Sequence, residues 1–139
     1  MTTHTVEFLK KLLSTPGPSG FEQAPARVWR DEVKGFADDL RADVHGNSIA
    51  SLNGKGKPRV MFAGHIDEIG IQITYIDDEG FLYFSGIGGW DSQVLVGQRV
   101  LVLAKDGPVH GVVGKKAIHQ IKKEERDKVT KVTDLWIDI

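Results

Sequence analysis

The sequence predicts an α/β protein in two parts: an α/β part over residues 1–68, then an all-β part over residues 69–139 with the pattern of a small barrel or sandwich. Apolar residues recur at helical spacing through residues 6–33. The run "RVMFAG" at residues 59–64 is apolar at nearly every position, which is typical of a strand covered on both faces in the parallel part of an α/β sheet. No helical period of useful length follows Gly70, so the boundary is expected near there.

Two short helices are expected first. The earlier one is predicted from four apolar residues at helical spacing: Val6, Leu9, Leu12 and Leu13. The sequence "PGPSG" at residues 16–20 ends it, because proline and glycine interrupt helices. The second helix is expected to begin near Ser19 or Phe21, since Ser19 and Glu22 have the spacing of a capping box, and to run to Val33.

Strands are expected from Leu40 onward. A hairpin is predicted with its turn at residues 45–47, followed by a loop rich in glycine and lysine and then by the "RVMFAG" strand. In the all-β part, turns are expected at residues 77–80 and 106–108. The last six residues, "DLWIDI", alternate like a strand and stop on an apolar side chain. They suit either a chain that ends within a fold or a final strand paired in a sheet.

The composition limits the classes of partner that the protein is expected to bind. The 139 residues carry 18 Lys and Arg against 19 Asp and Glu, so the basic excess typical of proteins that bind nucleic acid or anionic membranes is missing. There is no cysteine, so any metal must be held by His, Asp or Glu, and a reducing compartment is compatible. The N-terminal stretch lacks an apolar run of signal-peptide or membrane-span length. We therefore expect a cytoplasmic protein with no nucleic-acid or membrane partner.

The stretch "FAGHIDEIG" carries the main candidate for chemistry. His65 and Asp67 stand two residues apart at the end of a predicted strand, so both side chains can lie on one face. In such a pair the imidazole can bind a divalent metal through one nitrogen while the carboxylate accepts a hydrogen bond from the other. Ligands in open α/β sheets also bind beyond the carboxyl ends of the strands. The same pattern suits a structural His–Asp pair without a metal, and the spacing alone leaves both open.

The remaining candidates have plain structural interpretations. Four other histidines share no ligand spacing with a second metal-binding residue: His4, His45, His110 and His119. The glycines of "GIGGWD" at residues 86–91 are not followed by the lysine and helix of a phosphate loop. Trp90 could lie in the core or anchor an interface. No serine stands in a nucleophile elbow, and the mixed-charge segment at residues 122–131 is assigned no chemistry.

Five stretches together resemble a known family. "TPGPSGFE", "DVHGNSIASL", "VMFAGHIDEIGIQITYIDDEGFLYFSGIGGWDSQVLVGQRV", "GVVGKKAIH" and "DLWIDI" are similar to the N-terminal part of the dinuclear-metal aminopeptidases, which include glutamyl, deblocking and tetrahedral aminopeptidases and some relatives labelled endoglucanase. The resemblance covers nearly the whole chain. It implies that residues 1–68 are the N-terminal part of a zinc-peptidase-like three-layer α/β domain. Residues 69–139 would be an inserted, incomplete β-barrel domain that serves as a lid or in dimerisation.

The resemblance also implies a chemistry. His65 would be a ligand of one of two divalent ions, zinc or cobalt, and Asp67 would be the catalytic-site carboxylate that orients it. In that family a hydroxide held by the two ions attacks the N-terminal peptide bond of a peptide substrate, with a glutamate as general base. Relatives suggest a homo-oligomer. The remaining ligands and the general base would lie in the missing C-terminal part, so this chain alone is expected to be inactive.

Three hypotheses follow. In the first, the chain is one piece of a metal-dependent aminopeptidase, which its apolar end and the single candidate ligand His65 favour. In the second, it is a non-catalytic assembly or dimerisation module. In the third, it is an endoglucanase, for which the sequence offers no defensible pair of catalytic carboxylates.

Overall fold

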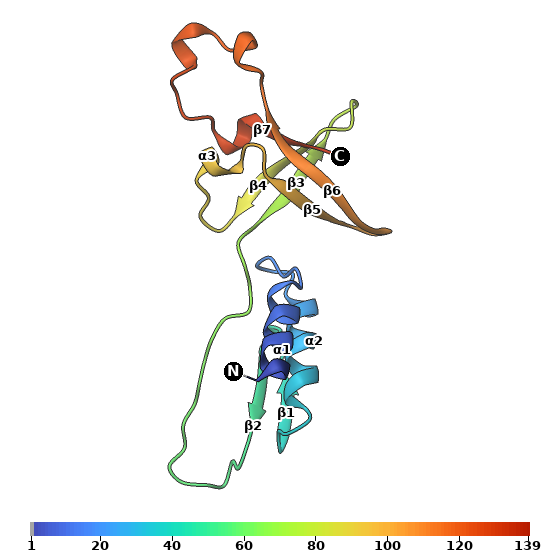
Figure 1. The fold of residues 1–139 in the computed structure, drawn as a ribbon, viewed down its shortest axis with the longest axis vertical. Coiled ribbons are helices and arrows are strands. Elements are labelled where there is room, and N and C mark those ends of the chain that lie inside the picture. Colours follow the sequence, from blue (N-terminus) through green and yellow to red (C-terminus); the bar gives the residue numbers. More distant parts are fainter. Residues whose placement is uncertain (1) are drawn as a thin grey trace. The chain divides into compact units, whose positions relative to one another are not determined.

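The computed structural model describes residues 2–139, which divide into two compact units that meet between Glu68 and Ile69. The first unit contains two helices and a hairpin (Figure 1): α1 (Thr3–Leu13), α2 (Gln23–Val33), β1 (Asp39–Ala42) and β2 (Ser48–Ser51). The second is mainly β: β3 (Gly70–Ile76), β4 (Leu82–Ile87), α3 (Ser92–Leu95), β5 (Arg99–Ala104), β6 (Gly107–Lys115) and β7 (Leu135–Asp138). Three short 3-10 helices precede β7: Ile118–Gln120, Lys123–Glu125 and Val132–Asp134.

The first unit is held together by packing of α1 on α2 and of α2 on β2. Helix α2 buries Ala26 and Val33. His4 of α1 lies 2.6 Å from the Glu32 carboxylate of α2, and the Arg30 guanidinium donates to Ser48 of β2 at 2.9 Å. Strands β1 and β2 pair in antiparallel register as the sequence predicts.

Helix α2 begins later than predicted. Glu22 is its N-cap residue and makes no side-chain capping bond, so the predicted capping box between Ser19 and Glu22 does not form. The Glu22 carboxylate instead accepts from the backbone N–H of Gly20. The Ser19 hydroxyl therefore remains available for a different partner.

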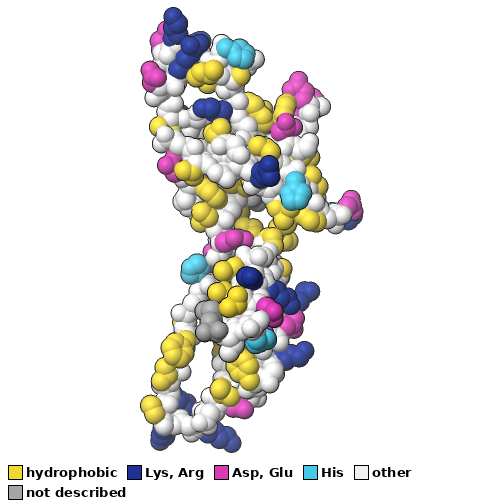
Figure 2. Space-filling view, viewed as in Figure 1, with side chains coloured by type: hydrophobic (Ala, Val, Ile, Leu, Met, Phe, Trp, Pro, Cys, Tyr) yellow, Lys and Arg dark blue, Asp and Glu magenta, His cyan; other side chains and the backbone are white. Residues whose placement is uncertain are grey.

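The predicted strand at residues 59–64 is wrong for this structure. The segment has no regular secondary structure, and its apolar side chains are exposed to 72% at Val60, 87% at Met61 and 95% at Phe62. Figure 2 shows hydrophobic side chains along this outlying segment of the first unit. A strand that is apolar on both faces needs neighbouring strands and a covering layer, whereas the sheet that the described residues form in this unit has only two strands, β1 and β2.

The second unit is a curled five-stranded antiparallel sheet in the order β3-β4-β7-β6-β5. Of the two interpretations left open for "DLWIDI", the structure shows the paired strand. Its strand β7 lies inside the sheet, between β4 and β6, where Ile137 is opposite both Leu82 and Val113. Strands β3 and β5 each pair with one neighbour among the described residues, so the predicted closed barrel stays a prediction.

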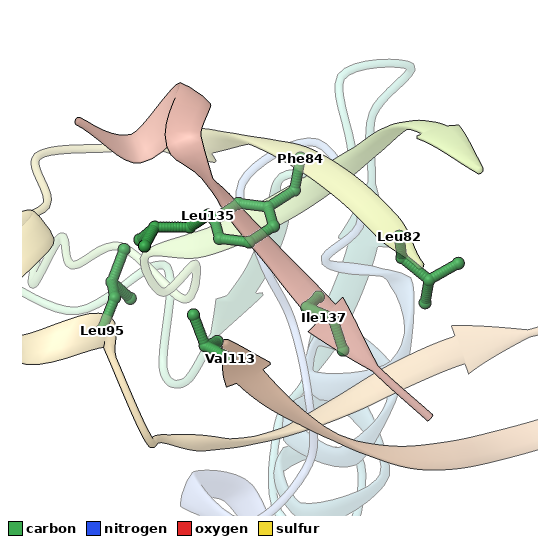
Figure 3. Packing of buried hydrophobic residues seen from close by; sticks show 6 residues of the cluster. All are labelled: Leu82, Phe84, Leu95, Val113, Leu135 and Ile137. Atoms are coloured by element: carbon green, nitrogen blue, oxygen red, sulfur yellow. The ribbon is translucent and has the colours of Figure 1, made fainter. Parts of the chain in front are cut away.

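The buried core of the second unit consists of apolar side chains. Six buried side chains from β4, α3, β6 and β7 point toward one another (Figure 3): Leu82, Phe84, Leu95, Val113, Leu135 and Ile137. Leu135 and Ile137 are 0% exposed, and burial of one such side chain stabilises the fold by about 1.5–3 kcal/mol. Trp90 packs against this cluster, and its indole N–H donates to the Gly70 carbonyl at 2.7 Å, which supports the core interpretation of Trp90.

Candidate functional site

The structure brings His65 and Asp67 into contact. The Nδ1 atom of His65 lies 2.9 Å from Oδ1 of Asp67 and 3.0 Å from its backbone carbonyl oxygen. Both acceptors lack hydrogens when the carboxylate is ionised, so Nδ1 must carry the proton. In the neutral ring the lone pair is then on the second nitrogen, Nε2, and the side chain of His65 is 84% exposed. This arrangement would allow the ring to bind a cation through Nε2.

Asp67 has a second partner that the sequence did not indicate. The Ser19 hydroxyl donates to Oδ2 of Asp67 at 2.5 Å, while Oδ1 faces His65. The Ser19 hydroxyl, and after it the His65 ring, lowers the pKa of the Asp67 carboxyl from its usual value, because both hydrogen bonds favour the charged form. Asp67 therefore carries its negative charge at neutral pH.

Three hydrogen bonds join Glu68 to the loop before α2. The Gly17 N–H donates to the Glu68 carboxylate at 2.9 Å, and the Glu68 N–H donates to the Gly17 carbonyl at 3.0 Å. The Ser19 N–H donates to the Glu68 carbonyl at 3.2 Å. Residues 17–19 and Glu68 thus form a short parallel bridge between segments about fifty positions apart in the sequence.

The same loop is seated on α2. Gly17 is buried, and a Cβ atom at this position would collide with the Pro25 ring in the first turn of the helix. Only glycine lets the backbone approach so closely. The sequence "PGPSG" predicts the end of a helix but not the contact of this loop with Asp67, for which the Gly-Pro-Ser-Gly composition of a tight loop was the available signal.

A complete metal site is not formed by residues 2–139, where no group of three or more His, Cys, Asp and Glu side chains is placed to hold an ion. A catalytic zinc usually has three protein ligands. The donor set at His65 therefore fits one ligand of a divalent site and its orienting carboxylate. Elsewhere, His4 pairs with Glu32, and the backbone N–H of His45 donates to Asp43 within a turn. In the described part of the chain no helix has the length and apolar composition of a membrane span.

Several known proteins are similar to this chain in sequence and in backbone structure. A lysyl aminopeptidase of Pyrococcus furiosus is 35% identical over 127 residues, which cover 91% of this chain and 36% of that protein. The structure of a TET aminopeptidase from a marine sediment Thaumarchaeota archaeon superposes with a TM-score of 0.94 at 38% identity, over 99% of this chain and 39% of that one. The chain therefore has the mixed α/β fold of the corresponding part of that enzyme.

A third similar protein is the TET1 peptidase of Pyrococcus horikoshii, which can assemble into a tetrahedron or a large octahedral shell. It matches with a TM-score of 0.80 at 41% identity, over 96% of this chain and 40% of that one. The chain spans between 36% and 40% of the length of these three relatives. The family model for M42 glutamyl aminopeptidases matches residues 46–139, more than half of the chain. The resemblance found in the sequence is confirmed, and the chain belongs to the M42 glutamyl aminopeptidase family.

Proposed function

We propose that the chain is one part of a metal-dependent aminopeptidase that removes N-terminal residues from peptides with two divalent ions, zinc or cobalt. The observation that carries this proposal is the His65–Asp67 pair, with its exposed Nε2 atom, in a chain of the M42 family. The chain spans about two fifths of its relatives and offers one candidate ligand, so we expect the activity to require further polypeptide and the chain alone to be inactive.

In the proposed mechanism His65 would hold one of the ions through Nε2. Asp67 accepts the Nδ1 proton, which fixes the tautomer and the plane of the ring. When bound, the two ions supply Lewis-acid polarisation of the peptide carbonyl and a nucleophilic water at neutral pH. The general-base glutamate and the remaining ligands come from the polypeptide that completes the site.

The two units take different proposed roles. Residues 1–68 form the beginning of the three-layer peptidase domain, and residues 69–139 form an inserted β-barrel domain that covers the site or joins subunits. The assembly described for the TET1 peptidase of Pyrococcus horikoshii supports a homo-oligomer for the whole protein. Balanced charge and the absence of cysteine support a cytoplasmic protein without nucleic-acid or membrane partners.

The exposed segment at residues 59–64 supports completion by further polypeptide. Its apolar side chains suit a strand that is covered on both faces, and they stand in solvent here. We expect this segment to become a core strand when the rest of the peptidase domain is present, either in the same chain or as a second chain. Until then it should make the isolated chain self-associate.

Metal uptake and peptidase activity of the complete protein test the proposal. We expect His65→Ala to lower zinc or cobalt occupancy and to abolish release of the N-terminal residue from a lysyl peptide. The matched control His45→Ala, in the hairpin turn, should retain both. Full metal content and activity in His65→Ala would contradict the proposal. If the wild-type protein binds no metal and has no peptidase activity, the assembly-module hypothesis is favoured. Release of reducing sugar from soluble glucans would favour the endoglucanase hypothesis.

A further inference from the structure

We propose that Ser19 is a positioning residue for the His65–Asp67 pair. Its hydroxyl fixes one carboxylate oxygen of Asp67 so that the other stays on Nδ1 of His65 and Nε2 faces outward. The inference rests on the proposed function for its purpose, since the ring it orients is the candidate metal ligand.

Each carboxylate oxygen of Asp67 has its own hydrogen-bond partner. Oδ1 accepts from His65 at 2.9 Å and Oδ2 accepts from Ser19 at 2.5 Å. A carboxylate that has one hydrogen bond can rotate about its terminal torsion, which is broad, and can present either oxygen or neither to the ring. A donor on the second oxygen removes that freedom. Asp67 is partly exposed, so packing alone does not fix the group.

Ser19 comes from a loop that is itself tied to the backbone of the pair. The Ser19 N–H donates to the Glu68 carbonyl, and Gly17 exchanges two further hydrogen bonds with Glu68. The loop also lies against Pro25, where only glycine at position 17 fits. These contacts hold the backbone of Ser19 beside residues 67 and 68, and so they place its hydroxyl next to Asp67.

The helix that follows does not use this hydroxyl. Ser19 and Glu22 have capping-box spacing, but α2 begins at Gln23 without a side-chain cap. A serine retained only to cap the helix would bond to the first-turn N–H groups. The observed acceptor is Asp67, 48 positions away in the sequence, which argues for a role in the site.

Nitrogen-15 NMR of the histidine rings in the full chain tests the inference without metal. The spectra are recorded at a pH at which the ring-nitrogen shifts are those of neutral imidazole, because the two neutral tautomers give distinct ring-nitrogen signals. His65, assigned with His65→Gln, is expected to be mainly the Nδ1-protonated tautomer. In Ser19→Ala the Nε2-protonated form should rise severalfold, and Ser19→Thr, which keeps the hydroxyl, should restore the wild-type ratio. Ser14→Ala, which removes an exposed hydroxyl after α1, is the matched control.

A second arm uses the complete protein and measures zinc affinity by chelator competition. Loss of a partner that orients a metal-binding histidine typically weakens affinity by about 10–100-fold, and we expect Ser19→Ala to lie near the lower end. If Ser19→Ala does not fold, Ser19→Cys replaces it, since a thiol is a weak donor of similar size. A His65 tautomer ratio that is unchanged in Ser19→Ala but altered in Asp67→Asn would overturn the inference and leave the proposed function intact. If the wild type binds neither zinc nor cobalt, the proposed function fails, while the metal-free tautomer result still decides the role of Ser19.

Discussion

The two units of this chain differ in how completely they bury their apolar residues. The second unit closes its core with its own strands, and Leu135 and Ile137 of β7 are fully buried at its centre. The first unit carries the candidate site, and its most apolar segment, residues 59–64, stands in solvent. Burial of a segment therefore depends on its neighbours as much as on its composition, because a strand is stabilised through cross-strand and face-to-face contacts. The second unit buries six apolar side chains in one cluster, whereas the buried apolar side chains of the first unit's core are Ala26 and Val33 of α2.

The largest expected effect is on the free energy of unfolding, and it is seen by making the same leucine-to-alanine substitution once in each unit. Leu135→Ala should reduce the free energy of unfolding of the second unit by about 2–5 kcal/mol, because it opens a cavity where a fully buried leucine was packed. Leu52→Ala, at a leucine that is 66% exposed in the first unit, should change the stability by less than about 0.5 kcal/mol. Urea unfolding followed by tryptophan fluorescence measures both. Equal costs would contradict the contrast between the units.

A smaller effect is expected at the loop beside the candidate site. Gly17→Ala places a methyl group against the Pro25 ring and should destabilise the first unit by about 1–3 kcal/mol, because the loop must move away from α2. Gly64→Ala is the matched control, since open space surrounds that position, and it should be neutral or slightly stabilising. Circular dichroism during thermal unfolding distinguishes the two. A neutral Gly17→Ala would show that the loop is not seated as described.

The exposed segment should govern self-association. Phe62→Asp removes the most exposed aromatic side chain of residues 59–64 and should weaken association of the chain about tenfold, the equivalent of roughly 1.4 kcal/mol of apolar contact. Val44→Asp, at a valine that is 97% exposed in the hairpin turn, should leave association unchanged. Sedimentation velocity over a range of concentrations gives the comparison. If the wild-type chain is monomeric throughout, the first unit does not need the covering layer inferred for it.

The smallest effect concerns acid stability in the hairpin of the first unit. The Asn47 side-chain amide lowers the pKa of Asp43, so the folded state favours the charged carboxylate. The resulting stability is present above the ordinary aspartate pKa of about 3.9 and is lost as the pH falls through the lower folded value. Asp43→Asn should flatten the pH dependence of the free energy of unfolding in this acid range, which urea unfolding at a series of pH values measures. The same slope in Asp43→Asn and the wild type would contradict this account.

The features that the sequence predicted correctly depend on nearby residues. The helices, the β1–β2 hairpin and the contact of His65 with Asp67 follow from local spacing, and strand alternation gave β7 as one of two interpretations of the last six residues. The metal-ligand role of His65 stays a prediction, because the two-residue spacing predicts that the side chains meet but does not show whether the ring binds a metal.

The features that it missed depend on distant residues. The position of β7 between β4 and β6 is set by pairing across large sequence separations, which alternation does not encode. The segment at residues 59–64 has the composition of a strand but lacks the neighbours that would pair with it. Ser19 has the spacing of a helix cap, yet a carboxylate 48 positions away competes for its hydroxyl, and a local pattern does not reveal that competitor.

The central claim is that this chain supplies part of a two-metal aminopeptidase and that the first unit is completed by further polypeptide. Native mass spectrometry of the protein purified from its source, compared with its denatured mass, tests this most directly. The account predicts either a 15.3 kDa chain bound to a second polypeptide or a longer parent chain, with two divalent ions in each complete site. A 15.3 kDa chain that assembles only with itself and carries no metal would contradict it and would leave an assembly module in its place.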